Sequence, residues 1–103
     1  MRKLIAIITL LIAATSATAQ TPSCDILAAM AGMTMVARQN GVTATKQIEI
    51  TNQHITDPME NKRATAIIIQ AYELPMMNVA RNKQVMINEF QSQIFVACLK
   101  GRI

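Results

Sequence analysis

The sequence predicts an all-α protein, a small bundle of three to four helices that is closed by a disulfide bond. Apolar residues recur at spacings of three and four along most of the chain beyond residue 22, as they do on the buried face of a helix. Capping residues, glycines and prolines divide this region into segments of helical length. The two cysteines, Cys24 and Cys98, lie near its two ends. We therefore expect one helical domain over residues 20–103.

Residues 1–19 have the pattern of a cleaved secretory signal peptide. Arg2 and Lys3 give a positively charged start, an apolar segment follows over residues 4–14, and small side chains occupy 17–19. The apolar segment is too short to span a bilayer, which takes about 20 residues. We expect export to the periplasm of a Gram-negative bacterium, with no membrane span once the signal peptide is removed.

The size and charge of the remaining chain exclude several classes of protein. Residues 20–103 are too few for a two-domain enzyme, a Rossmann unit or a barrel. Loss of Arg2 and Lys3 lowers the net charge from +4 to +2, and the remaining charges are scattered. The chain has one tyrosine, two phenylalanines and no tryptophan. A nucleic-acid-binding protein would usually show a basic stripe and interleaved aromatic residues, so we exclude that class.

The cysteine pair predicts one intramolecular disulfide, because the periplasm is oxidising. A bond between Cys24 and Cys98 closes nearly the whole domain, which the chain-entropy treatment values at about 4–5 kcal/mol. The alternative makes Cys24 a lipid-modified cysteine. Against this alternative, residues 21–23 are a poor lipoprotein signal, and Cys24 lies ten residues beyond the apolar segment.

The first expected helix begins at Ser23, a good N-cap, with Asp25 in its first turn. Gly41 is placed to end it in a left-handed conformation. Between them, residues at helical spacing are Ile26, Leu27, Met30, Met33, Thr34 and Ala37. A weaker helical segment follows over 43–52, where β-branched residues also permit a short strand or a loop.

The third expected helix has the clearest start in the chain. Asp57 is an N-cap, Pro58 occupies the first helical position, and Glu60 completes a capping box. Pro75 ends the helix. One apolar face contains Ala64, Ile67, Ile68, Ala71 and Leu74.

The fourth expected helix runs from about Asn78 to Lys100, with Gly101 just beyond its end. Its apolar stripe contains Val79, Met86, Phe90, Ile94 and Ala97. A disulfide between the first and last helices requires their cysteine Cα atoms to lie within about 7 Å. We therefore expect these two helices to pack side by side and antiparallel.

The titratable residues do not predict an enzyme. His54 lies in a polar segment that we expect to be a loop, with no nucleophile or orienting group beside it. Asp57 and Glu60 are explained by helix capping, and nothing in the sequence brings Glu73 and Glu89 together. No catalytic residue, metal ligand or cofactor is assigned.

Methionine is the outlier of the composition, with eight in the chain. Met30, Met33 and Met35 are spaced like a copper motif, but Met35 points about 140° away from Met30 on a helix. We interpret the methionines as core residues that replace scarce aromatics. The pair Met76 and Met77 is a candidate contact surface.

The end of the last helix raises a second candidate surface. Residues 94–99 are apolar all round, whereas a surface helix keeps one side polar. Phe95 and Leu99, four residues apart, either pack against the first helix or form an exposed contact patch. Packing is the favoured alternative, because the first helix is itself apolar nearly all round.

Three short segments carry a resemblance to a known group of proteins. They are Ala37-Arg38-Gln39-x-Gly41-Val42, Ala71-Tyr72-Glu73-x-Pro75, and the stretch from Glu89-Phe90 to Cys98. With Cys24 in front of them, the chain resembles an uncharacterised family of small exported helical proteins from proteobacteria and their phages. The resemblance implies the helical fold and the disulfide, and it implies no activity or partner.

The residues of these segments also have local explanations. Arg38 complements the dipole at the end of the first helix, Tyr72 buries its ring with its hydroxyl at the rim, and Glu73 either pairs with Arg38 or is solvated. The candidate interaction residues are Arg38, Tyr72, Met76, Met77, Phe95 and Leu99.

These observations favour a non-catalytic, protein-binding module of the periplasm, an inhibitor, immunity or exclusion factor whose partner is another exported or envelope protein. One alternative is a stress chaperone that resembles the small acid-stress chaperones of the enteric periplasm. Another is a Cu(I) carrier that uses methionine ligands. The apolar surface would also permit a homodimer.

Overall fold

The structure, a computed structural model, describes residues 23–103; the expected signal peptide lies outside the described residues. This part of the chain forms four helices and no strand, which confirms the predicted all-α bundle. The helices are α2 (Cys24–Gln39), α3 (Ala44–His54), α4 (Pro58–Glu73) and α5 (Ala80–Leu99).

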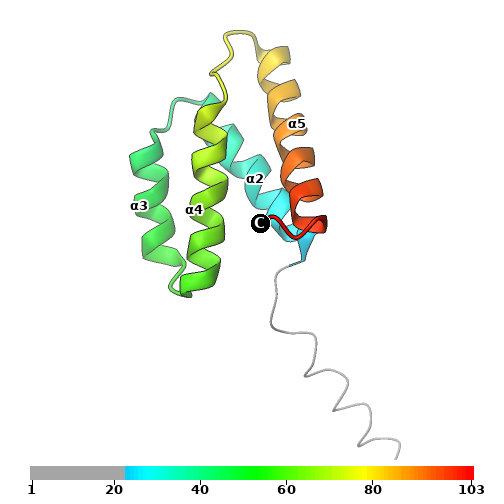
Figure 1. Cartoon of the computed structure of the whole chain (residues 1–103). Coiled ribbons are helices and arrows are strands. Elements are labelled where there is room, and N and C mark those ends of the chain that lie inside the picture. The colour runs from blue at the N-terminus through cyan, green and yellow to red at the C-terminus, as the bar shows by residue number, and fades with distance from the viewer. Residues whose placement is uncertain (1–22) are drawn as a thin grey trace, which may run out of the picture.

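Helix α2 is the centre of the bundle. It crosses behind α4 and α5 in Figure 1 and packs against both, while α3 packs on the far side of α4. The buried cluster between these helices contains Leu27, Ala31, Met35, Ile67, Ala71, Phe90 and Ile94. Three helices thus form one core, and α3 is an outer layer on α4.

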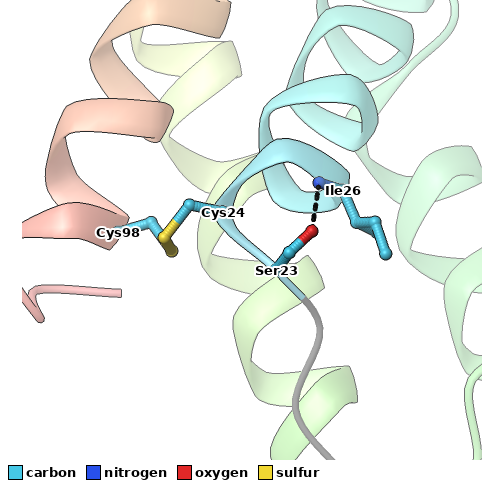
Figure 2. The surroundings of a disulfide bond; sticks show 4 residues. All are labelled: Ser23, Cys24, Ile26 and Cys98. Carbon is cyan, nitrogen blue, oxygen red and sulfur yellow. Dashed lines mark hydrogen bonds between the residues drawn. A yellow bond between two sulfur atoms is a disulfide. The ribbon is translucent and has the colours of Figure 1, made fainter. Parts of the chain in front are cut away.

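The disulfide joins the start of α2 to the end of α5 (Figure 2). The Cα atoms of Cys24 and Cys98 are 5.5 Å apart, so the two helices run antiparallel, as predicted. Beside the bond, the Ser23 hydroxyl accepts a hydrogen bond from the Ile26 backbone N–H at 3.4 Å and caps α2.

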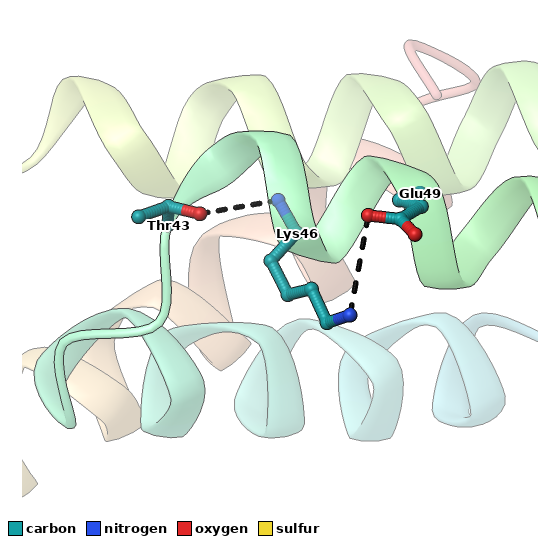
Figure 3. Close-up of polar contacts among 3 residues, drawn as sticks. All are labelled: Thr43, Lys46 and Glu49. Atoms are coloured by element: carbon teal, nitrogen blue, oxygen red, sulfur yellow. Dashed lines mark hydrogen bonds and ion pairs between the residues drawn. The ribbon is translucent and has the colours of Figure 1, made fainter.

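Side-chain caps also begin the two middle helices. The Asp57 carboxylate accepts from the Glu60 N–H at 2.9 Å, and the Thr43 hydroxyl accepts from the Lys46 N–H at 3.2 Å (Figure 3). Lys46 also approaches Glu49 at 4.0 Å, with both side chains more than half exposed, so this ion pair adds little to stability.

Residues 44–54 are helical, which settles the alternatives of strand and loop left open for this segment. The placement of His54 in a loop was wrong, because the helix continues through it as its last residue. The Thr43 cap explains why the segment is helical, because a satisfied first turn compensates for the poor helix propensity of the residues that follow. The helix includes His54 because the Ile55 N–H still donates to the Thr51 carbonyl at 2.8 Å.

Glycine ends both helices of the disulfide-linked pair. Gly41 follows α2 with φ of +87°, and Gly101 follows α5 with φ of +71°, conformations that favour glycine. After α2, the Val42 N–H donates to the Ala37 carbonyl at 3.0 Å. The same closing hydrogen-bond pattern follows α5, as the sequence predicted.

The apolar residues of α2 and α5 are not all buried. The expected stripe of α5 included Val79, but α5 begins at Ala80 and Val79 is 57% exposed. In α2, Ile26 and Met33 face solvent at 54% and 74% exposure. The buried side of α2 instead contains Leu27, Ala31, Met35 and Gln39, which follow one another every four residues.

Residues 101–103 turn back from the end of α5 toward α4 (Figure 1). Ile103 packs against the core cluster, and this segment lies beside Met59, Arg63 and Ala66 of α4. The segment therefore covers the core near the disulfide.

Candidate functional site

A buried polar cluster lies at the end of the bundle opposite the disulfide, where α2 ends and the α4–α5 loop passes. Its centre is Gln39, which is 2% exposed. The Gln39 Nε2 donates to the Pro75 carbonyl at 3.0 Å, and its Oε1 accepts from the Met77 N–H at 2.7 Å. One side-chain amide therefore holds the loop backbone on both sides of Met76.

Two cations strengthen this attachment. The Arg38 Nη2 donates to the Leu74 carbonyl at 3.2 Å. The Lys83 Nζ donates to the Gln39 carbonyl at 2.9 Å, where a positive charge is favourable at the C-terminus of α2. Residues 74–79, which we call the clamped loop, are thus tied to the end of α2 by Arg38 and Gln39, and Lys83 of α5 ties the helix that follows the loop to the same place.

Tyr72 extends the cluster to α3. Its ring lies under the Arg38 guanidinium, 4.9 Å from the ring centroid to Cζ. Its hydroxyl donates to the Val42 carbonyl and accepts from the Gln47 Nε2 at 2.6 Å. Gln47 also donates to the Thr34 carbonyl at 3.1 Å. The polar contacts therefore connect α2, α3 and α4 at one end of the molecule.

The clamped loop presents apolar side chains to solvent. Met76 is 44% exposed, and Val79 is 57% exposed. Val79 caps α5 without a side-chain hydrogen bond, and the first turn of α5 contains no acidic residue. Arg81, in that turn, is exposed. The surface is an apolar tip next to a positive helix end.

Four of the six candidate interaction residues belong to this region: Arg38, Tyr72, Met76 and Met77. Among them, the Arg38 Nη2 and the Tyr72 hydroxyl are engaged in internal hydrogen bonds, and the Met77 side chain is half-buried. Met76 is the member most open to a partner.

Phe95 and Leu99 lie at the other end of the molecule, beside Cys98. Phe95 is half-buried, one helical turn beyond Gln91, while Leu99 is 65% exposed. The structure therefore does not bring these two residues together with the clamped loop.

Sequence reasoning missed Gln39, Gln47 and Lys83. A signal for Gln39 was present, because it continues the four-residue spacing of Leu27 and Met35 onto the buried side of α2. A polar residue on an apolar line needs buried hydrogen-bond partners. Those partners lie 36 and 38 residues away in the chain.

The methionines of the copper-like spacing in α2 do not point to one place. Met33 is exposed, whereas Met35 is fully buried with its Sδ 3.4 Å from the Gln39 amide, so the two sulfurs face opposite sides of α2. Within residues 23–103, no group of three or more His, Cys, Asp or Glu side chains is arranged to hold a metal ion. None of the helices in that range has the length and apolarity to cross a membrane.

The fold and this cluster define a small disulfide-closed helical domain with a rigidly held surface loop. No protein-family model, curated protein or solved structure matches the chain.

Proposed function

We propose that this protein is a small, non-catalytic binding module of the bacterial periplasm, of the inhibitor, immunity or exclusion type, that recognises another exported protein through the clamped loop. The observation that carries the proposal is the buried Gln39 amide, bonded to the backbone before and after the exposed Met76. A loop that is already ordered loses less conformational entropy when it binds.

The exposed groups of the loop suggest the chemistry of the partner. Met76 has a flexible, polarisable side chain that adapts to an apolar pocket. Arg81 and the uncapped start of α5 add positive potential beside it. The loop therefore fits an apolar pocket with an acidic rim.

The compartment is part of the proposal. The Cys24–Cys98 disulfide persists in an oxidising environment, and residues 1–19 have the pattern of an export signal. An exported domain of this size that must survive outside the cytoplasm gains from such a covalent closure.

A pull-down from a periplasmic extract of the source organism tests the proposal, with the tagged, oxidised protein as bait and quantitative mass spectrometry as readout. We expect one protein enriched at near-equal stoichiometry. Met76→Asp should weaken its capture at least about tenfold. Met59→Asp is the matched control, because Met59 is 62% exposed in the first turn of α4, at the opposite end of that helix.

Three outcomes would contradict the proposal. If the Met76→Asp variant still captures the partner and the Leu99→Asp variant does not, the binding site lies at the disulfide end of the molecule. A broad set of unfolded proteins, bound equally by all variants, would indicate a chaperone. Absence of any partner, together with one Cu(I) ion retained in native mass spectrometry, would indicate a copper carrier. Circular dichroism of each variant checks that the fold is intact.

A further inference from the structure

A basic hollow lies at the disulfide end of the molecule, where residues 101–103 turn back toward α4 (Figure 1). Its volume is about 350 Å³. Lys62 and Arg63 line it from α4, and Arg102 lines it from the segment after α5. Of the described residues that line this hollow, none is acidic. We call its three cations the basic cluster.

The backbone brings the basic cluster together from two parts of the chain. Lys62 and Arg63 are neighbours on α4, and Arg63 is half-buried. Arg102 comes beside them because Gly101, with φ of +71°, reverses the chain after α5. The Arg102 N–H then donates to the Ala97 carbonyl at 2.9 Å, so the position of its backbone is fixed.

No carboxylate neutralises the basic cluster. Within residues 23–103, none of its side chains forms an ion pair with an aspartate, a glutamate or the Ile103 carboxylate. Glu60, one turn before Arg63 on α4, lines a different hollow, an apolar one between α2 and α4. Like charges that share a hollow repel each other more than on an open surface, because less water separates them. A bound anion removes this repulsion, so the hollow favours an anionic ligand.

We propose that the basic hollow binds the phosphate group of an anionic amphiphile, a phosphate ester that carries an alkyl or acyl chain. A phosphate monoester has a charge of about −1.5 to −2 at neutral pH, so it matches three cations better than a single carboxylate does. The Arg63 guanidinium suits a two-point contact with phosphate oxygens. Lys62 and Arg102 add donors from α4 and from the segment after α5.

The rest of the lining suits the apolar chain of such a ligand. Met59, Ala66 and Ile103 supply apolar surface beside the basic cluster, and Met59 is 62% exposed. A chain attached to the phosphate removes this surface from water, which is favourable. The described lining contains no aromatic side chain on which the bases of a nucleic acid would stack. The hollow therefore fits an amphiphile better than a nucleic acid.

The positive surface continues beyond the hollow. Arg102 also lines a neighbouring hollow together with Lys100 and Val96, and none of the described residues around that hollow is acidic. Basic surfaces of this kind attract anionic lipid headgroups. A membrane lipid and a soluble phosphate ester therefore share the chemistry that the basic hollow recognises.

This inference goes beyond the proposed function. The basic cluster lies at the disulfide end of the molecule, whereas the clamped loop lies at the opposite end. Capture of a protein partner through the clamped loop and binding of a phosphate ester can each fail without the other.

A titration of the oxidised protein with dodecyl phosphate, below its micelle-forming concentration, tests the proposal. We expect shifts in amide NMR spectra that are confined to residues 59–66 and 97–103. Lys62→Gln and Arg102→Gln should each weaken binding about fivefold. Lys46→Gln is the matched control, because Lys46 is an exposed lysine on α3 and its loss lowers the net charge equally. Circular dichroism checks that each variant is folded.

A second measurement identifies the source of the phosphate. Co-sedimentation with vesicles of phosphatidylglycerol, but not with vesicles of phosphatidylcholine, would support the proposal with a membrane lipid as the ligand. Binding of dodecyl phosphate without co-sedimentation would support it with a soluble ester as the ligand.

Several results would overturn the proposal. One is that dodecyl phosphate does not bind, or binds no more tightly than inorganic phosphate, because the apolar chain then contributes nothing. Another is that dodecyltrimethylammonium shifts the same amides equally, because the cations then do not select the ligand. Equal effects of Lys62→Gln and Lys46→Gln would also overturn it. So would a result in which Lys62→Gln abolishes capture of a protein partner and leaves binding of dodecyl phosphate unchanged.

Discussion

Gln39 shows how one residue can fix a loop far away in sequence. A glutamine amide contains one acceptor and two donors, and here it satisfies both a backbone N–H and a backbone carbonyl of the clamped loop. Glutamate lacks the donor and leucine lacks both groups. Only a side chain with this chemistry and this length completes the pair.

We expect Gln39→Ala to lower the free energy of unfolding by about 1–3 kcal/mol, because the backbone groups of Pro75 and Met77 lose their partner. Urea denaturation measures this loss, and hydrogen exchange should show faster exchange of the Met77 amide. Gln70→Ala, at an exposed position of α4, should change stability by less than about 0.5 kcal/mol. Equal effects of the two substitutions would show that the clamp contributes nothing.

Local residue roles could be predicted from the sequence because they depend on near neighbours. Ser23 and Asp57 cap helices, and Gly41 ends one, through contacts within a few residues. The role of Gln39 could not be predicted in the same way, because its partners come from a segment that only the folded chain brings close.

At the scale of the elements, α2 and α5 approach closely at Gly32. A Cβ atom built on Gly32 would lie 2.7 Å from Nε2 and 2.8 Å from Cδ of Gln91. The Gln91 side chain therefore occupies the place where any other residue of α2 would project. Without a side chain at position 32, Gln91 can lie flat across the helix pair.

This contact predicts an energetic coupling between the two positions. Gly32→Ala should stabilise the Gln91→Ala background by about 0.5–1 kcal/mol, the gain in helix propensity. In the natural background the same substitution must displace Gln91, so it should give less stabilisation or none. A double-mutant cycle by urea denaturation measures the coupling. Equal effects of Gly32→Ala in both backgrounds would contradict the packing described here.

The sequence predicted that the helices exist, but it predicted only in part which side of each helix is buried. Capping signals and apolar spacing located the four helices of residues 23–103 to within a few residues. The direction that α2 faces was not evident, because its sequence is apolar nearly all round. Which apolar residues are buried, such as Met35, and which are exposed, such as Met33, depends on where α4 and α5 pack.

At the scale of the whole molecule, the α2–α5 pair is closed at both ends by different means. Cys24 and Cys98 join one end covalently, while Gln39 and Lys83 join the other through hydrogen bonds. The core lies between these two closures. Cysteine usage allowed the first closure to be predicted, whereas the second depends on tertiary contacts.

Loss of the disulfide should lower the free energy of unfolding by about 4 kcal/mol, because the unfolded chain regains the freedom of a long loop. The double substitution Cys24→Ser with Cys98→Ser tests this by urea denaturation. Reduction of the natural protein with dithiothreitol should shift the midpoint by a similar amount. Unchanged midpoints in both experiments would show that the bond does not constrain the unfolded chain.

In covalent terms, the closed chain is almost a ring. The cysteines are 74 residues apart in sequence and 5.5 Å apart between Cα atoms. A single peptide cut between them, for example in the clamped loop, leaves both pieces in one molecule. Linking the chain near the disulfide and opening it at that loop would give a circularly permuted protein with the same four helices in a new order.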